Sequence, residues 1–108
     1  MENLMSLALE AHNPQKNHHR RYEIEIGRDL FEEWTLSIRY GRVGRVGQAK
    51  LFSSKHIEEL EPIIRERLRR RITSRNRIGC SYKVVKLEEA DSFSAGCVLA
   101  NELLERLQ

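Results

Sequence analysis

The feature that most constrains this chain is a strand-patterned segment that runs directly into three evenly spaced glycines. Over residues 34–40, apolar and polar residues alternate, which is the period-two pattern of a strand with one buried face. Gly41, Gly44 and Gly47 follow, and glycine permits the backbone conformations that a tight turn requires. The pattern predicts a strand, a glycine turn and a returning strand over residues 46–52.

Neighbouring segments predict the rest of the core. Residues 22–26 alternate in the same way, and three consecutive strands of this kind most simply form an antiparallel meander. A helix is expected from Lys55 onward, with its apolar residues on one face. These apolar residues are Ile57, Leu60, Ile64, Leu68 and Ile72. Pro62 lies inside this helix and removes a backbone donor, so we expect a kink or a split into two pieces. Residues 80–85 predict a fourth strand.

Both ends of the chain carry further apolar patterns. Residues 2–12 have the apolar spacing of a helix that Asn13-Pro14 stops, and a last helix is expected from about Ser94 to Arg106. The predicted fold class is therefore α+β, a small antiparallel β-sheet with one long helix packed on it, plus N- and C-terminal helical extensions. The predicted divisions are an N-terminal helix and linker over 1–19, a central module over 20–86 and a C-terminal helical extension over 87–108.

Charge is unevenly distributed along the chain. The net charge is only +3, but between His19 and Lys86 there are 17 Lys and Arg against 9 Asp and Glu, a net charge of +8. The two flanks together hold 2 basic and 7 acidic residues. A basic module with acidic tails suits a nucleic-acid partner, and it is also compatible with an ordinary solvated surface. Charge alone does not choose between these interpretations.

Composition and spacing argue against several other classes of function. The two cysteines, Cys80 and Cys97, form no CxxC pair and lie far from the N-terminal histidines, so we expect no metal site and no cofactor. The glycine spacing lacks the ending of a P-loop, and no cluster of catalytic residues has motif-level support, so we expect no enzyme. No apolar run approaches the roughly 20 residues that span a bilayer, and the N-terminus lacks the basic start of an export signal. We expect a cytoplasmic protein without a membrane partner.

The segment from Arg21 to Trp34, followed by Tyr40-Gly41-Arg42-Val43-Gly44, resembles the WGR domain. This small module is named for a Trp-Gly-Arg tripeptide and occurs beside the catalytic domain of some poly(ADP-ribose) polymerases and in short bacterial proteins. The resemblance covers roughly residues 20–86 and implies no polymerase chemistry. In this chain a tyrosine replaces the tryptophan, which keeps an aromatic ring with a smaller stacking area and adds a hydroxyl.

The resemblance implies a role for the tripeptide. In the DNA-repair polymerases that share the module, the aromatic ring packs against the sugar at a broken DNA end and the arginine lies at the DNA backbone. Tyr40 and Arg42 are therefore expected to do the same, with a core position as the alternative for Tyr40. Arg42 and Arg45 carry forked guanidinium groups that suit phosphate. Their alternative is a salt bridge to Glu32 or Glu33.

The second half of the predicted helix is the densest basic segment. Successive helical residues are 100° apart, so Arg67, Arg70 and Arg71 share one flank, while Arg65 and Arg69 share the other. This arginine collar suits nucleic acid, and positive charge at a helix C-terminus is also favourable by itself. The expected nucleic-acid-binding residues are Tyr40, Arg42, Arg45, Arg39, Lys50, Arg67, Arg70 and Arg71.

The expected function is noncatalytic binding of nucleic acid, with DNA favoured over RNA and with DNA ends or breaks as the target. The alternative is a protein–protein interaction or dimerisation module without direct nucleic-acid binding. In that case a second copy or another protein would cover the Leu4 to Leu9 and Val98 to Leu107 faces of the terminal helices.

Overall fold

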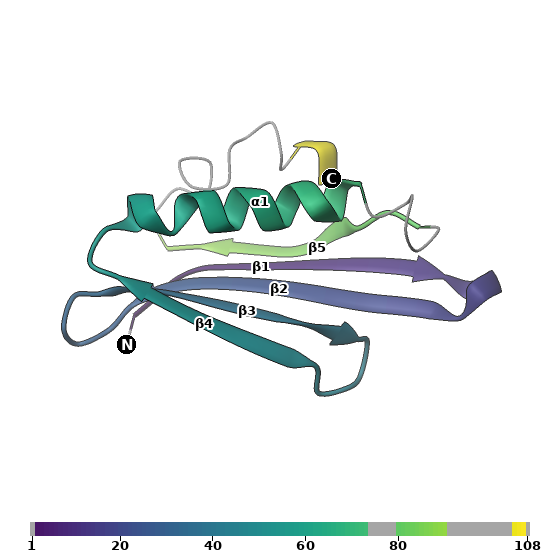
Figure 1. Cartoon of the computed structure of the whole chain (residues 1–108). Coiled ribbons are helices and arrows are strands. Elements are labelled where there is room, and N and C mark those ends of the chain that lie inside the picture. Colours follow the sequence, from purple (N-terminus) through teal and green to yellow (C-terminus); the bar gives the residue numbers. More distant parts are fainter. Residues whose placement is uncertain (1, 74–79, 91–104, 108) are drawn as a thin grey trace.

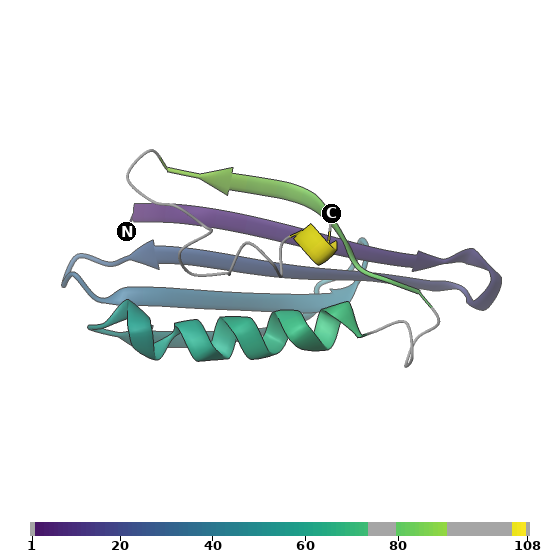
Figure 2. The same cartoon turned by 90° about the horizontal axis from the view of Figure 1, so that it is seen from above.

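The computed structural model describes residues 2–73, 80–90 and 105–107 of the 108-residue chain. Within this part, five strands form one antiparallel sheet in the order β4-β3-β2-β1-β5, and a helix covers one of its faces (Figures 1 and 2). The strands are β1 (Glu2–Asn13), β2 (His18–Arg28), β3 (Trp34–Arg42), β4 (Gln48–Ser54) and β5 (Lys83–Glu89). The helical elements are the 3-10 turns η1 (Pro14–Lys16) and η2 (Ile57–Glu59) and the α-helix α1 (Glu61–Ile72).

The predicted N-terminal helix and linker are wrong, because residues 2–13 form β1, which pairs with β2 on one side and β5 on the other. The same residues that suggested a helix also contain an alternating set, Met5, Leu7, Leu9 and Ala11, and each of these is at most 1% exposed. Pairing on both sides favours the period-two pattern over the helical one. The expected linker is the tip of the β1–β2 hairpin, with η1 at its end.

The predicted meander is confirmed by β2, β3 and β4, which are consecutive and antiparallel. Cross-strand pairs align apolar side chains on one face, as in Ile24 opposite Ile38 and Ile26 opposite Leu36. All four of these side chains are fully buried. We call this side of the sheet the helix face, because α1 lies on it, and the other side the open face. The fourth predicted strand also exists, as β5 at the β1 edge, shifted to Lys83–Glu89.

Pro62 does not kink the helix, because α1 starts at Glu61 and the proline occupies the first turn, where its missing donor costs nothing. The separate 3-10 turn η2 precedes it, so the expected split into two pieces is confirmed. Leu60, Ile64 and Leu68 are buried against the helix face. This apolar stripe fixes the orientation of α1 and places its arginine-rich C-terminal end near the end of β3.

The core also includes a residue from the end of the chain. Residues 105–107 are helical, and Leu107 is 1% exposed within the hydrophobic core. Figure 2 shows this short segment over β1 and β2, beside α1. Most of the predicted C-terminal helix, including residues 94–104, lies outside the described residues. Leu107 therefore packs against the sheet of its own chain.

Candidate nucleic-acid interface

The end of β3 positions the Tyr40-Gly41-Arg42 tripeptide. Successive residues of a strand point to opposite faces, and the register places Tyr40 opposite Tyr22 and Arg42 opposite Arg20. Tyr40 and Arg42 therefore lie on the helix face, whereas Arg39 lies on the open face. The predicted binding residues are thus divided between two surfaces.

Tyr40 is half-buried at the margin of the core. Its ring stacks on that of Tyr22, with ring centroids 6.1 Å apart and planes inclined by 25°, and its hydroxyl donates to Gln48 Oε1 at 2.9 Å. The guanidinium carbon of Arg71 lies 4.0 Å from the centroid of the Tyr22 ring. The alternative for Tyr40 was a core position. The fully buried core tyrosine is its neighbour Tyr22 instead. Tyr40 is the outer member of a cation–aromatic stack, and as a residue it stays partly exposed.

Burial has an electrostatic consequence for Tyr22. Desolvation raises the pKa of its hydroxyl, because the charged phenolate is disfavoured away from water, while the positive charges of Arg71 and Arg67 oppose this shift. The hydroxyl oxygen has no hydrogen-bond partner among the described residues. Tyr22 therefore supports the site as a neutral ring beneath Tyr40.

Arg42 is exposed and binds the tip of the β1–β2 hairpin. Its Nη1 donates to the backbone oxygen of Asn17 at 3.0 Å, and its Nη2 donates to Oδ1 of the same residue at 3.1 Å. The alternative of a salt bridge from Arg42 to Glu32 or Glu33 is wrong, because those residues precede the opposite end of β3. Arg42 is thereby held at a fixed position beside the stack.

The glycines of the β3–β4 turn are required by the backbone itself. A Cβ atom at Gly47 would lie 1.9 Å from the Tyr40 carbonyl oxygen, and one at Gly41 would lie 2.8 Å from the Gly47 Cα. Gly44 has a φ of +79°, in the left-handed region. Close contact between the two chain segments explains the spacing without any ligand. A hollow of about 40 Å³ beside this turn is lined by Arg39 and Arg45, among others.

The remaining predicted residues take different positions around this end. Lys50 lies opposite Ile38 and hence on the helix face, at the exposed edge strand β4. Arg67 and Arg71 are half-buried on one flank of α1, and both influence Tyr22, so the predicted shared flank is confirmed for this pair. Arg70 is exposed. The fold thus gathers Tyr40, Arg42, Lys50, Arg67 and Arg71 around one end of the helix face.

Ion pairing distinguishes these cations from their neighbours. In the described part of the chain, Arg39, Arg45, Lys50 and Arg67 form no salt bridge. By contrast, the guanidinium of Arg21 pairs with Glu10 and Glu23 on the open face. The cations without a salt bridge can neutralise phosphate charge. The charge of Arg21 is already largely neutralised by its two carboxylate partners.

Sequence reasoning missed three residues of this site. Arg20 lies exposed opposite Arg42, Tyr22 forms the floor of the stack, and Asn17 receives the Arg42 fork. Alternation within β2 places Arg20 and Tyr22 on one face. The pairing register of β2 with β3 would therefore have placed both residues beside Arg42 and Tyr40. No sequence pattern predicts the contact of Asn17 with Arg42, because the two residues are 25 positions apart.

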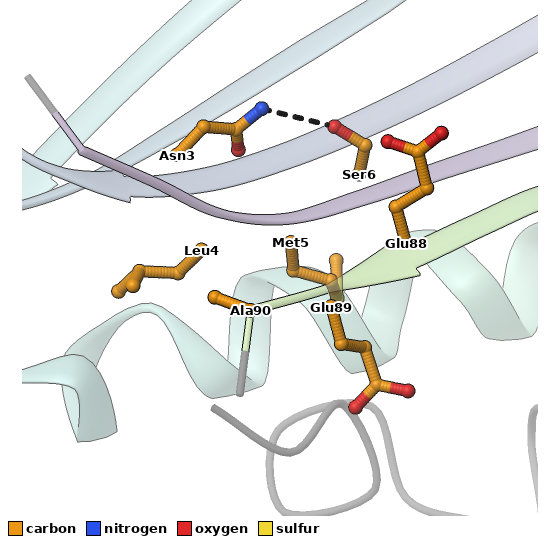
Figure 3. Close-up of a pocket in the computed structure, with 7 residues that line it drawn as sticks. All are labelled: Asn3, Leu4, Met5, Ser6, Glu88, Glu89 and Ala90. Carbon is orange, nitrogen blue, oxygen red and sulfur yellow. Dashed lines mark hydrogen bonds between the residues drawn. The ribbon is translucent and has the colours of Figure 1, made fainter. Parts of the chain in front are cut away.

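The opposite end of the sheet has a different character. A cavity of about 210 Å³ lies between the start of β1 and the end of β5, and Glu88 and Glu89 are among the residues that line it (Figure 3). Asp29, Glu32 and Glu33 lie in the β2–β3 loop at this same end. Carboxylates would repel a phosphate backbone, so within the described residues the end with the β3–β4 turn suits nucleic acid better than this one. Among the described helices, none is long and apolar enough to cross a membrane.

The described residues form a small α+β module with an aromatic ring and several cations at one end of its sheet, an arrangement that suits a nucleic-acid partner. The model of the WGR domain family matches residues 5–76, two thirds of the chain, and the chain belongs to this family. The family is of the nucleic-acid-binding type, and its modules are noncatalytic. The match begins at residue 5, within β1, in agreement with the place of this strand inside the sheet. No curated protein matches the chain.

Proposed function

We propose that this chain binds DNA, with ends or breaks as its preferred sites, through the basic end of the helix face. The observation that carries the proposal is the partly exposed residue Tyr40, whose ring stacks on Tyr22 and which lies on the same face as Arg42. Such a ring can pack on a terminal sugar or base, because the flat face of a base pair is exposed only where a duplex ends or is broken. Lys50 and Arg67 supply further positive charge on the same side.

The two members of the tripeptide are assigned different tasks. Arg42 contributes charge and hydrogen-bond donors to phosphate, which acts on every DNA regardless of its ends. Tyr40 contributes contact area and selects a terminus. The guanidinium group of Arg42 already donates two hydrogen bonds to Asn17. A phosphate must therefore accept from the remaining N–H groups of Arg42 or replace Asn17 as the acceptor.

Fluorescence anisotropy with labelled DNA over a series of salt concentrations tests the proposal. If about three to five phosphates are contacted, log K should fall against log salt with a slope of about −3 to −4.5. Arg42→Ala should make this slope shallower by about one unit on all DNA. Tyr40→Ala should leave the slope unchanged and cost about 1–3 kcal/mol on blunt or nicked duplex, with a much smaller loss on closed circular duplex.

Two matched variants control for indirect effects. Arg65→Ala removes an arginine from the other flank of α1, where Arg65 pairs with Glu61 at 3.8 Å, and should change the slope little. Asn17→Ala removes the side-chain acceptor of Arg42 and shows how much of the Arg42→Ala effect comes from the hairpin. A flat salt response of the unmodified chain, or no binding at about 50 mM salt, would contradict the proposal.

A protein-interaction function is favoured by a different surface from the one the sequence suggested. The side chains from Leu4 to Leu9 are buried in the sheet, so they are not a dimer interface. The β2–β3 loop instead presents Leu30 and Phe31 at 87% and 86% exposure. Asp29 Oδ1 holds this loop by accepting from the backbone N–H of Phe31 at 2.9 Å. Native mass together with the DNA titration separates this alternative from DNA binding.

A further inference from the structure

The tip of the β1–β2 hairpin carries two histidines that face each other across the strands. His12 and His19 are directly opposite in register, and their Nδ1 atoms are 2.8 Å apart. The ring centroids are 5.1 Å apart and the ring planes are inclined by 51°. In Figure 1 this hairpin extends past the ends of β3 and β4, so its tip is accessible. The histidine pair is not used by the proposed DNA-binding function.

A carboxylate fixes the proton position on one of the two rings. His12 Nε2 is 2.9 Å from Glu10 Oε1, and the other oxygen of Glu10 accepts from Arg21. A carboxylate paired with an arginine accepts hydrogen bonds, so Nε2 of His12 carries the proton and its Nδ1 carries the lone pair. The lone pair therefore lies on the nitrogen that faces His19.

We propose that His12 and His19 form a two-nitrogen binding site for a divalent transition-metal ion of the class that prefers imidazole, namely Cu²⁺, Ni²⁺ or Zn²⁺. Two nitrogens that each lie about 2.0 Å from one ion are separated by about 2.8 Å at a right angle and about 3.3 Å at the tetrahedral angle. The observed separation of 2.8 Å corresponds to the right-angled arrangement, which Cu²⁺ and Ni²⁺ favour.

The surroundings of the pair resemble those of known metal-bound histidines. A ligating histidine commonly donates its other ring N–H to a carboxylate, which orients the ring and raises its basicity, and Glu10 has this relation to His12. Among the described residues, no group of three or more His, Cys, Asp or Glu side chains is placed to hold a metal ion. Water or an atom of a bound partner completes the coordination, so the site is open.

Binding of the ion requires a tautomer change at His19 and a turn of the two rings, so that both Nδ1 lone pairs point to the ion. Without metal, His19 donates its Nδ1 proton to the Nδ1 lone pair of His12, which accounts for the short contact. With metal, the His19 proton moves to its Nε2, and neutral imidazole carries its proton on either nitrogen. The net charge of the two rings stays the same, and the ion replaces the shared proton between them.

Isothermal titration of the untagged full chain with CuCl₂, NiCl₂ or ZnCl₂ at neutral pH tests the site. We expect saturable binding of one ion per chain, tightest for Cu²⁺ or Ni²⁺. His12→Ala and His19→Ala should each weaken binding at least about tenfold, and Glu10→Gln should weaken it by about 10–100-fold. Broadening of amide NMR signals by Cu²⁺ should be confined to the hairpin residues 10–13 and 18–21.

The chain supplies its own controls. His18→Ala removes the neighbouring histidine, which lies opposite Asn13 and hence on the other face, and His56→Ala removes an exposed histidine far along the chain. Both variants should bind the ion as the unmodified chain does. Equal losses in all four histidine variants would show nonspecific binding and overturn the proposal. Absence of saturable binding would show that the contact between His12 and His19 is a hydrogen bond only, and would likewise overturn it.

Discussion

Replacing Gly47 with alanine should be far more costly than replacing Gly44, although both glycines lie in the same turn. At Gly47 the new Cβ would lie 1.9 Å from the Tyr40 carbonyl oxygen, 2.6 Å from its carbonyl carbon and 3.1 Å from the Gly41 Cα. These are backbone atoms, so no side-chain rotation relieves the overlap. The strands must separate where Tyr40 pairs with Gln48, the last pair between β3 and β4.

The expected loss follows from the contacts that separation removes. Overpacking costs about 1–3 kcal/mol, and each hydrogen bond lost at the end of the strands adds about 0.5–1.5 kcal/mol. We expect Gly47→Ala to lower the free energy of unfolding by about 2–4 kcal/mol. At Gly44 no heavy atom lies within 4 Å of the new Cβ, and only the φ of +79° is unfavourable, so Gly44→Ala should cost about 1–2 kcal/mol.

Urea unfolding measures both variants, with the fluorescence of Trp34, the single tryptophan, as the signal. Because the turn also positions Tyr40 and Arg42, Gly47→Ala should weaken DNA binding under conditions where the variant remains folded. Equal destabilisation by the two substitutions would refute the reasoning, since it would show that backbone contact at Gly47 does not constrain the turn.

Two further predictions concern the core. Tyr22→Phe should raise stability by about 1 kcal/mol at neutral pH, because it removes a buried hydroxyl without a partner among the described residues. It should also remove part of the stability loss above about pH 10, where the unfolded chain deprotonates Tyr22 before the folded chain with its raised pKa does. Urea unfolding at neutral and alkaline pH checks both, and a destabilised Tyr22→Phe would contradict them. Leu107→Ala should lower the free energy of unfolding by about 2–5 kcal/mol, and an unchanged urea midpoint would show that the C-terminal segment does not pack on the sheet.

The parts of the fold that could be predicted depend on local patterns. Alternation in β2 and β3 identifies both strands and places Tyr40 and Arg42 on one face, because strand periodicity acts between adjacent residues. Residues 2–12 satisfy two periodicities at once, and only pairing with distant strands decides between them. The helix prediction from apolar spacing therefore failed in this segment, where the pattern fits both a helix and a strand and tertiary contacts select the strand.

The candidate site shows the same limit. Its basic character was evident from composition, but its arrangement depends on contacts between segments far apart in sequence. Arg71 reaches Tyr22 from the end of α1, and Arg42 reaches Asn17 at the hairpin tip. No rule of sequence spacing connects such pairs. The sequence therefore predicted which residues belong to the site better than it predicted which residues they contact.

The division of the cations between two faces gives the salt dependence of DNA binding a structural meaning. One phosphate backbone that follows the helix face can meet Arg20, Arg42, Lys50 and Arg67, and four neutralised phosphates correspond to a slope of about −3.6. Arg39 and Arg45 line the hollow beside the turn, and Arg39 points to the open face. Their participation would add two phosphates and steepen the slope to about −5.4. The measured slope therefore distinguishes DNA held on one face from DNA held on both sides of the β3–β4 turn.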